Sequence, residues 1–314
     1  MPLLVVNSDP ERLWGKKEIP NYVCFDFTSA GTGNKNLKFT SDGNLTTSAF
    51  ESISYSIDEC ETWTTVANEG QSITINVPIT DGLKVYWKGS ANNLATNKNG
   101  NSSFYIDSSD YTCNISGNIM SLLYGDDFED KTEFPEDSSN NFKGLFCPPI
   151  NKSMYPTFDG FILPATTLTY GCYSQLFERN KGIITTPELP ATTLATYCYA
   201  MMFVGCTSLT TAPELPVMTL ESQCYSNMFR GCTSLTTAPE LPATTLKIMC
   251  YTYMFKDCTS LNYVKALCTT GLGDTYSSNW LTNVAAEGTF VKAAGVNHPT
   301  AVNGIPSGWT VEEV

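Results

Sequence analysis

The eleven letters "CTSLTTAPELP" occupy residues 206–216 and occur again, unchanged, at residues 232–242, which is 26 residues further along the chain. Leu-Pro pairs extend the same spacing, at 163–164, 189–190, 215–216 and 241–242. A repeat of this length is typical of architectures in which units stack on one another, because one unit cannot bury its own apolar face. The sequence therefore predicts a stack of repeats over residues 161–262.

Each repeat is expected to contain one helix and one extended segment. Four apolar residues of "ATTLATYCYAMMFVG" (191–205) fall on one helical face, namely Leu194, Cys198, Met201 and Met202. Thr192 or Thr193 is a typical N-cap and Gly205 a typical helix end. "TSLTTAPELP" (207–216) is too rich in Thr and Pro for a helix and is expected to be extended. The repeats are thus predicted to form an α/β solenoid whose extended segments pair in a parallel sheet.

The segment before the repeats has the pattern of β-strands. Between residues 21 and 120, stretches such as "SISYSI", "SITINV" and "KVYWKG" alternate apolar and polar residues, with turn residues between them. Several short strands at this spacing predict an antiparallel β-sandwich of immunoglobulin-like type, with Trp63 and Trp87 in its core. The chain is therefore expected to be multi-domain and β-rich.

Three further segments complete the expected organisation. Residues 1–20 are interpreted as an N-terminal arm for attachment or assembly, and residues 121–160 as an acidic linker and N-terminal cap of the repeats. Residues 263–314 are expected to form a C-terminal cap, because a stack needs atypical end units.

The charge of the chain excludes one class of partner. The formal net charge is −13, whereas a nucleic-acid binder needs a basic face. Most of the excess acid lies in residues 1–160, and residues 161–262 are nearly neutral, with many Thr, Ser and Tyr residues. This composition suits polar, uncharged ligands better than ions.

The sequence also indicates where the chain is made. "MPLLVVNSDPERLW" at the N-terminus has neither a basic segment nor a long apolar run, and Cys24 follows no hydrophobic segment. We therefore expect neither a signal peptide nor a lipoprotein anchor. Because no stretch approaches the roughly 20 apolar residues that span a bilayer, we also expect no membrane insertion, and folding in the cytoplasm.

Twelve cysteines are present, and most of them follow the repeat. They recur in two columns, at Cys172, Cys198, Cys224 and Cys250 and at Cys206, Cys232 and Cys258. Equivalent residues of stacked repeats form buried columns, for which free Cys is well suited, whereas a zinc site would need CxxC pairs or nearby histidines. Reduced core thiols are the favoured interpretation, and disulfides are the alternative.

No catalytic arrangement is evident. The one histidine, His298, lies in a Gly/Asn/Pro-rich segment without a nucleophile motif and is expected to be a solvated loop residue. The acidic run 125–141 lacks the DxDxDG order of a calcium loop, so a solvated loop is favoured and Ca²⁺ binding remains the alternative. We therefore expect no enzyme activity, no cofactor and no metal.

Two repeated columns of residues are the candidate ligand-binding residues. A tyrosine follows the first cysteine of each unit, and a glutamate precedes each Leu-Pro pair from the second unit onward: Tyr173, Tyr199, Tyr225 and Tyr251, with Glu188, Glu214 and Glu240. Aromatic rings beside acids can stack on sugar rings and accept hydrogen bonds from hydroxyls. The alternative is that the tyrosines pack between neighbouring units and the glutamates cap turns.

The repeats resemble a known family. "LPATTLATYCYAMMFVGCTSLTTAPELP" (189–216) resembles the BspA-type leucine-rich repeats of gut Bacteroidales and the phages that infect them. "SNWLTNVAAEGTFVKAAG" (278–295) and "GIPSGWTV" (304–311) resemble the ending of such arrays, and "ISYSIDECETWTTV" (53–66) resembles their N-terminal module. The resemblance covers most of the chain from about residue 37 and implies surface recognition or adhesion, without naming a ligand.

The expected function follows from this resemblance and from the missing export signal. Virions assemble in the cytoplasm and reach the host surface from outside, so we expect a virion structural protein of a crAss-like or similar phage. It would be a head or tail fibre or receptor-binding component that recognises a host polysaccharide or protein. We expect a homotrimer that contacts other virion proteins through residues 1–20. The alternative is a BspA-like adhesin on the bacterial cell surface.

Overall fold

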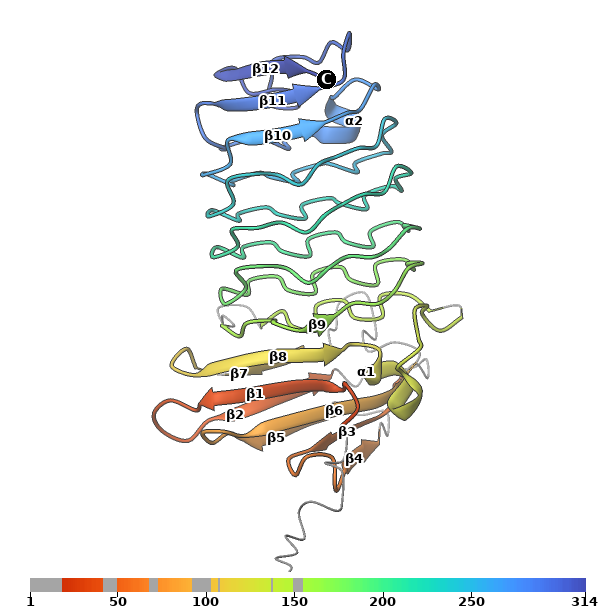
Figure 1. Cartoon of the computed structure of the whole chain (residues 1–314), viewed down its shortest axis with the longest axis vertical. Helices are drawn as coiled ribbons and strands as arrows, with labels where there is room; N and C mark the ends of the chain where they lie inside the picture. The colour runs from red at the N-terminus through yellow and green to blue at the C-terminus, as the bar shows by residue number, and fades with distance from the viewer. Residues whose placement is uncertain are drawn as a thin grey trace, which may run out of the picture.

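The computed structural model of the chain describes residues 19–41, 50–67, 73–91, 103–106, 108–136, 138–148 and 155–314. The predicted N-terminal arm therefore lies almost wholly outside the described residues. The molecule is elongated, with strands β1–β8 at one end, stacked coils in the middle and strands β10–β12 at the other end (Figure 1). It is β-rich, with several sheets, none of them closed, and few helices.

The largest sheet has six strands. In chain order they are β1 (Val23–Ser29), β3 (Phe50–Ser56), β4 (Thr64–Ala67), β6 (Lys84–Ala91), β8 (Thr112–Asn118) and β9 (Phe161–Ile162). Their spatial order is β4-β3-β6-β1-β8-β9, antiparallel throughout except for the parallel pair β8–β9. Because β9 follows the acidic segment in sequence, this sheet joins the strand-rich end of the molecule to the stacked coils.

A second, antiparallel sheet packs against the first. It contains β2 (Asn36–Ser41), β5 (Ile73–Pro78) and β7 (Ser103–Ile106) in the order β5-β2-β7. Phe104 of β7 contacts Phe25 of β1 and Trp87 of β6, with ring centroids 5.1 and 4.8 Å apart. Trp87 is buried as predicted, whereas Trp63 is only partly buried and lies beneath the Lys88 ammonium at 4.3 Å. Rings of the two sheets are thus in contact, and the predicted immunoglobulin-like β-sandwich stays a prediction.

The acidic segment after β8 is held by specific contacts. Helix α1 (Ser121–Tyr124) and the 3₁₀ turn η2 (Gly125–Asp127) follow β8 directly. The Asp126 carboxylate accepts hydrogen bonds from the Tyr22 hydroxyl (2.5 Å) and from Lys88 Nζ (2.7 Å). Further on, the Phe142 N–H donates to the Cys172 carbonyl (2.8 Å), so the stack of coils already begins within residues 140–146.

The segment predicted as a helix, 191–205, is a run of tight turns from residue 196 onward. Every second N–H donates to the carbonyl three residues earlier, as Cys198 does to Ala195 (3.2 Å). The N–H groups between them donate to the next coil, as Tyr199 does to Cys224 (3.1 Å). An α-helix would keep all of these bonds within one segment. Here half of them tie neighbouring coils together.

Left-handed backbone at every fourth residue explains why no helix forms. Tyr197, Met201 and Gly205 have φ angles of 60°, 60° and 70°, which a right-handed helix cannot contain. A four-residue turn repeat still buries residues three and four apart, so its apolar pattern resembles that of a helix. The helical part of the predicted α/β solenoid is therefore wrong: residues 163–262, all described, contain no helix, and α2 (Asp274–Ser277) comes after them.

Columns of aromatic rings run along the inside of the stack. Phe177, Phe203, Phe229 and Phe255 form one column, with neighbouring centroids 5.5–5.6 Å apart and ring planes within 13° of parallel. All four rings are buried, as are the repeated leucines and cysteines around them. Since buried aromatic side chains contribute large apolar areas, this column is a main source of cohesion between coils.

The C-terminal end is a parallel sheet. Strands β10 (Tyr263–Ala266), β11 (Gly288–Lys292) and β12 (Trp309–Glu313) pair in that order. The Trp280 ring, just before β11, stacks on Tyr251 at 5.9 Å and contacts Phe290 at 6.0 Å. These rings join the sheet to the last repeat, and the role of residues 263–314 as a C-terminal cap stays a prediction.

Candidate binding surface

The four candidate tyrosines lie in the core. Tyr173, Tyr199, Tyr225 and Tyr251 are 1–2% exposed, and neighbouring rings stack at 5.9–6.4 Å. Burial raises the pKa of each phenol well above its usual value. A ligand cannot reach these ring faces, so the prediction that they bind sugar is corrected: they pack between coils, which was the alternative.

The three candidate glutamates lie on the surface. Glu188, Glu214 and Glu240 are exposed, while the leucine that follows each of them is buried. This alternation is that of an extended segment whose leucine enters the core. The structure therefore separates the two predicted columns, with tyrosines inside and glutamates outside.

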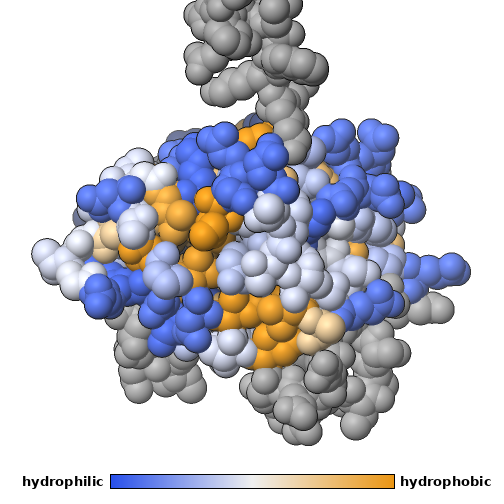
Figure 2. Space-filling model, turned by 90° about the horizontal axis from the view of Figure 1, so that it is seen from below, coloured by the Kyte–Doolittle hydropathy of each residue, from blue (hydrophilic) through white to orange (hydrophobic). Residues whose placement is uncertain are grey.

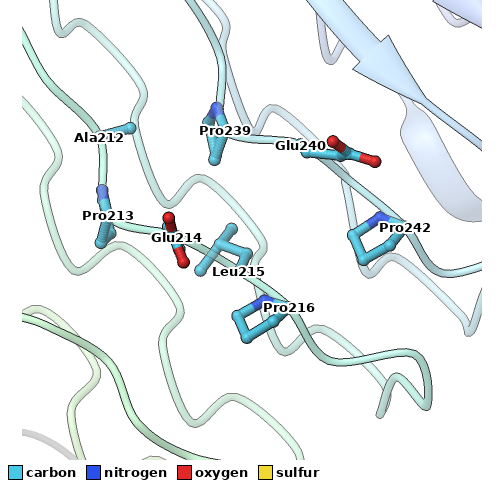
Figure 3. A pocket seen from close by; sticks show the side chains of 8 residues that line it. All are labelled: Ala212, Pro213, Glu214, Leu215, Pro216, Pro239, Glu240 and Pro242. Atoms are coloured by element: carbon cyan, nitrogen blue, oxygen red, sulfur yellow. The ribbon is translucent and has the colours of Figure 1, made fainter.

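Two shallow hollows lie between the glutamate-bearing segments of successive coils. One, of about 450 Å³, is lined by residues 185–190 and by parts of the next segment, including Thr211 and Glu214. The other, of about 460 Å³, is lined by residues 212–216 with Pro239, Glu240 and Pro242. Figure 3 shows the second hollow, with proline rings and carboxylates contributed by two adjacent coils. We call residues 185–190, 211–216 and 239–242 together the proline–glutamate face.

The prolines account for these hollows. A proline has no N–H, so each Pro-Glu-Leu-Pro segment can offer only the N–H groups of its Glu and Leu residues. In residues 187–190 and 213–216, all of which the structure describes, no backbone hydrogen bond to a neighbouring coil is present. Neighbouring coils are therefore not paired along these two segments, and open space remains between them.

The carboxylates of the face differ in their surroundings. Glu240 pairs with Lys265 of the next coil, with Nζ and Oε1 3.0 Å apart. Within the described part of the chain, neither Glu188 nor Glu214 has an ion-pair partner. These two carboxylates can thus accept hydrogen bonds from a ligand without first losing a partner.

Sequence reasoning found the glutamates but not the residues beside them. The hollows are also lined by Thr185, Thr211 and the repeated prolines, which follow the same 26-residue spacing as the glutamates. The 26-residue spacing was therefore the feature of the sequence from which these lining residues could have been found. What the sequence did not reveal was that the prolines, rather than the tyrosines, stand beside the acids.

The other candidate chemistry does not converge. No group of three or more His, Cys, Asp or Glu residues that could hold a metal occurs among the described residues, and Asp137 of the acidic run lies outside them. His298 is half-buried rather than solvated as expected: its Nδ1 accepts a hydrogen bond from the Leu272 N–H (3.4 Å).

The cysteines are buried, as predicted. All twelve are free thiols, and burial raises the pKa of Cys172 to about 12. The second column makes a repeated contact, since Cys206 and Cys232 each place Sγ 3.1 Å from the carbonyl of a phenylalanine in the coil before. Protonated, buried thiols are poor nucleophiles, so the cysteines act as core residues.

No protein-family model, curated protein or solved structure matches this chain. The resemblance to BspA-type repeats therefore stays a prediction. Among the described residues, no helix is long and apolar enough to cross a membrane.

Proposed function

We propose that this protein is a non-catalytic surface-recognition component of a phage virion, a head or tail fibre or receptor-binding part. In this proposal the stacked coils are a solenoid of the BspA-type leucine-rich-repeat class, carried by an immunoglobulin-like sandwich. The proline–glutamate face contacts the host bacterial surface, and its ligand is a polysaccharide.

One observation carries the proposal: an exposed face presents equivalent hollows on successive coils. An enzyme needs one constellation of groups, which repetition does not improve, whereas a recognition surface gains from repeated equivalent contacts. The hollows combine proline rings, which offer apolar contact, with the free carboxylates of Glu188 and Glu214, which accept hydrogen bonds. That combination suits the apolar faces and hydroxyl groups of sugars.

Weak single contacts would have to act together. One hollow offers a few hydrogen bonds and a small apolar area, for which millimolar affinity is a reasonable magnitude. Linking several such sites raises the overall affinity by about 10²–10⁴ without any new contact. We therefore propose a homotrimer, assembled through residues 1–20 or the strand-rich end, that presents several proline–glutamate faces at once.

The surface of the strand-rich end is compatible with assembly there. Figure 2 views the molecule from this end and shows hydrophobic patches bordered by hydrophilic side chains. Ile57, which follows β3, is 57% exposed. Covering such patches in an oligomer would be favourable, since the free energy gained scales with the apolar area removed from water.

The second candidate function is a BspA-like adhesin on the bacterial cell surface. The repeat motif at 189–216 favours it, since the proteins that this motif resembles include exported bacterial proteins. Mass spectrometry separates the two candidates. Recovery in stoichiometric amounts from purified virions supports the first, and recovery from the envelope of uninfected cells supports the second and contradicts the first.

A competition assay tests the recognition surface. Purified protein is expected to block attachment of virions to host cells, and the double variant Glu188→Gln with Glu214→Gln is expected to block several-fold less well. The matched control is Glu287→Gln with Glu312→Gln, which removes the same charge from exposed positions outside the face. Equal loss in both double variants would show that net charge, not the proline–glutamate face, governs attachment.

A further inference from the structure

A pair of exposed tyrosines lies at a different place from the buried tyrosine column. Tyr170 is 49% exposed and Tyr197 is partly exposed. Their ring centroids are 5.6 Å apart and the ring planes are inclined at 65°, an edge-to-face arrangement. Unlike Tyr173 and Tyr199, these rings are accessible to a ligand.

The backbone under both rings is fixed by bonds to the neighbouring coils. The Tyr170 carbonyl accepts a hydrogen bond from the Asn140 N–H (2.7 Å), and the Tyr197 N–H donates to Ser222 (3.2 Å). Gly171, between the two tyrosines along the chain, donates to Thr196 (3.1 Å). Because both rings stand on anchored backbone and support each other, little conformational entropy is lost when a ligand binds.

Three uncharged polar residues follow the pair along the stack. Hydrogen bonds between successive coils define which residues are stacked on one another. Thr196 and Ser222 occupy the position of Tyr170 in the next two coils, and Gln223 occupies the position of Tyr197 in the coil after it. All three side chains are partly exposed and can donate or accept hydrogen bonds. An ionic ligand would find no partner among these three residues, whereas an uncharged ligand with hydroxyl groups would.

We propose that Tyr170 and Tyr197 form a stacking subsite for one sugar ring of a neutral polysaccharide. The C–H face of the sugar lies on the exposed tyrosine surface, and its hydroxyls reach Gln223, Ser222 or Thr196. This proposal rests on the proposed recognition function and adds to it a contact outside the proline–glutamate face. Two rings cover far less than the roughly 1,200 Å² that a stable protein interface buries, so a small unit of a polymer fits better than a folded partner.

The test is calorimetric titration of the full chain with three neutral polysaccharides: dextran, α-mannan and xylan. We expect at least one to bind the unaltered protein. For that polymer, Tyr170→Ala and Tyr197→Ala should each lower the affinity about three- to tenfold, the range expected for one lost aromatic contact. Tyr170→Phe keeps the ring and should bind within about twofold of the unaltered protein.

Tyr253→Ala is the matched control. Tyr253 is also partly exposed and has a φ of 55°, close to the 60° of Tyr197, but it lies two coils away. Its replacement should leave the affinity unchanged, and all variants should keep the circular dichroism and melting temperature of a folded protein.

The possible failures are distinguishable. Unchanged binding by both Tyr170→Ala and Tyr197→Ala would overturn the subsite and leave the proposed recognition function standing. If none of the three polymers binds the unaltered protein, the subsite and the glycan part of the proposed function both fail. The virion assignment would still be decided by mass spectrometry.

Discussion

The repeat coils and the C-terminal sheet stack in the same direction but are held together differently. In the C-terminal sheet, β10, β11 and β12 pair along their whole lengths, four residue pairs in one ladder and five in the other. Between the repeat coils, the strand side has only isolated bridges, such as Thr185 with Thr211. Segments therefore stack in the same way in both regions, although a continuous backbone ladder joins them in the C-terminal sheet and almost none joins them in the repeats.

We infer that proline causes the difference. From the second unit onward, each repeat carries two prolines in its Pro-Glu-Leu-Pro segment, and β10, β11 and β12 contain none. Pairing returns where a proline-free segment meets a repeat: the Leu241 N–H donates to Lys265 (3.0 Å), and the Leu267 N–H donates to Leu241 (3.0 Å). These two bonds form where only one of the facing segments contains proline, whereas between the Pro-Glu-Leu-Pro repeats both segments contain it.

The comparison shows how a stack can keep one face open. The repeat coils gain cohesion from the turn side, where N–H groups bond between coils, and from the buried aromatic columns. Their strand side is then free to leave hollows, which a paired sheet would close. Cohesion between coils and the proposed binding face thus lie on opposite sides of each coil.

Removing a ring from the phenylalanine column should have the largest effect. Phe229 is fully buried and stacks on Phe203 and Phe255 at 5.6 and 5.5 Å, so Phe229→Ala should lower the free energy of unfolding by about 3–5 kcal/mol. Urea denaturation measures the change. A loss below about 1 kcal/mol would show that the columns do not hold the coils together, and the comparison would fail.

Two cysteines provide a smaller, paired test of the same packing. Cys232 Sγ lies 3.1 Å from the Phe203 carbonyl of the coil before, whereas Cys224 Sγ makes no such contact with a neighbouring coil among the described residues. Serine could keep the first contact, whereas at position 224 its hydroxyl would be buried without a partner in the neighbouring coil. We expect Cys224→Ser to cost about 1–3 kcal/mol and Cys232→Ser to cost less, measured by urea denaturation.

Reducing agent supplies the control for the cysteines. Because all twelve thiols are free, adding a reductant should leave the melting temperature of the unaltered protein unchanged. A large drop in the melting temperature would show that disulfides stabilise the protein. For the serine variants, an equal loss of unfolding free energy in both would show that the Cys232 contact contributes nothing.

The repeat could be predicted from sequence, but the conformation within it could not. Spacing alone located the stack, the buried cysteines and the exposed glutamates. The helix prediction failed because a turn every four residues buries Cys198 and Met202 just as a helix does, and only the φ angles distinguish the two. The tyrosines were misplaced for the same reason, since the inside of a turn repeat holds adjacent residues such as Cys198 and Tyr199.

Replacing prolines tests the cause of the open face directly. The double variant Pro213→Val with Pro216→Val restores two N–H groups to one segment. We expect slower amide hydrogen exchange over residues 211–216, with the free energy of unfolding changed by less than about 1 kcal/mol. The gain from new hydrogen bonds, about 0.5–1.5 kcal/mol each, is offset by the greater freedom of the unfolded chain without proline.

Exchange in the C-terminal sheet is the reference for this variant. Residues 263–266 should exchange slowly with or without the proline substitutions, because their ladder does not involve the altered segment. If residues 211–216 remain as fast as before, proline is not what keeps the repeat coils unpaired.

The smallest effect concerns pH and only the C-terminal end, where the chain has its one histidine. Burial, with a smaller contribution from Lys292, lowers the pKa of His298 below its usual 6.5. The Leu272 N–H donates to Nδ1, so the proton of the neutral ring is on Nε2, which lies 3.8 Å from Cys268 Sγ. Protonation of Nδ1 would remove the acceptor that Leu272 uses.

The sign of the pH effect follows from the lowered pKa. Above pH 6.5 both the folded and the unfolded chain carry a neutral histidine, and its contribution to stability is complete. As the pH falls below 6.5, the unfolded chain binds the proton first, so stability declines until the folded-state pKa is reached. Because the imidazole signal is unique in the proton NMR spectrum, its titration gives the folded-state pKa directly. We expect a midpoint below 6.5 and, for His298→Gln, a melting temperature less dependent on pH between 5 and 7. A midpoint at or above 6.5 would show that burial does not disfavour the charged ring, and this end of the stack would then be no more sensitive to mild acid than the repeat coils.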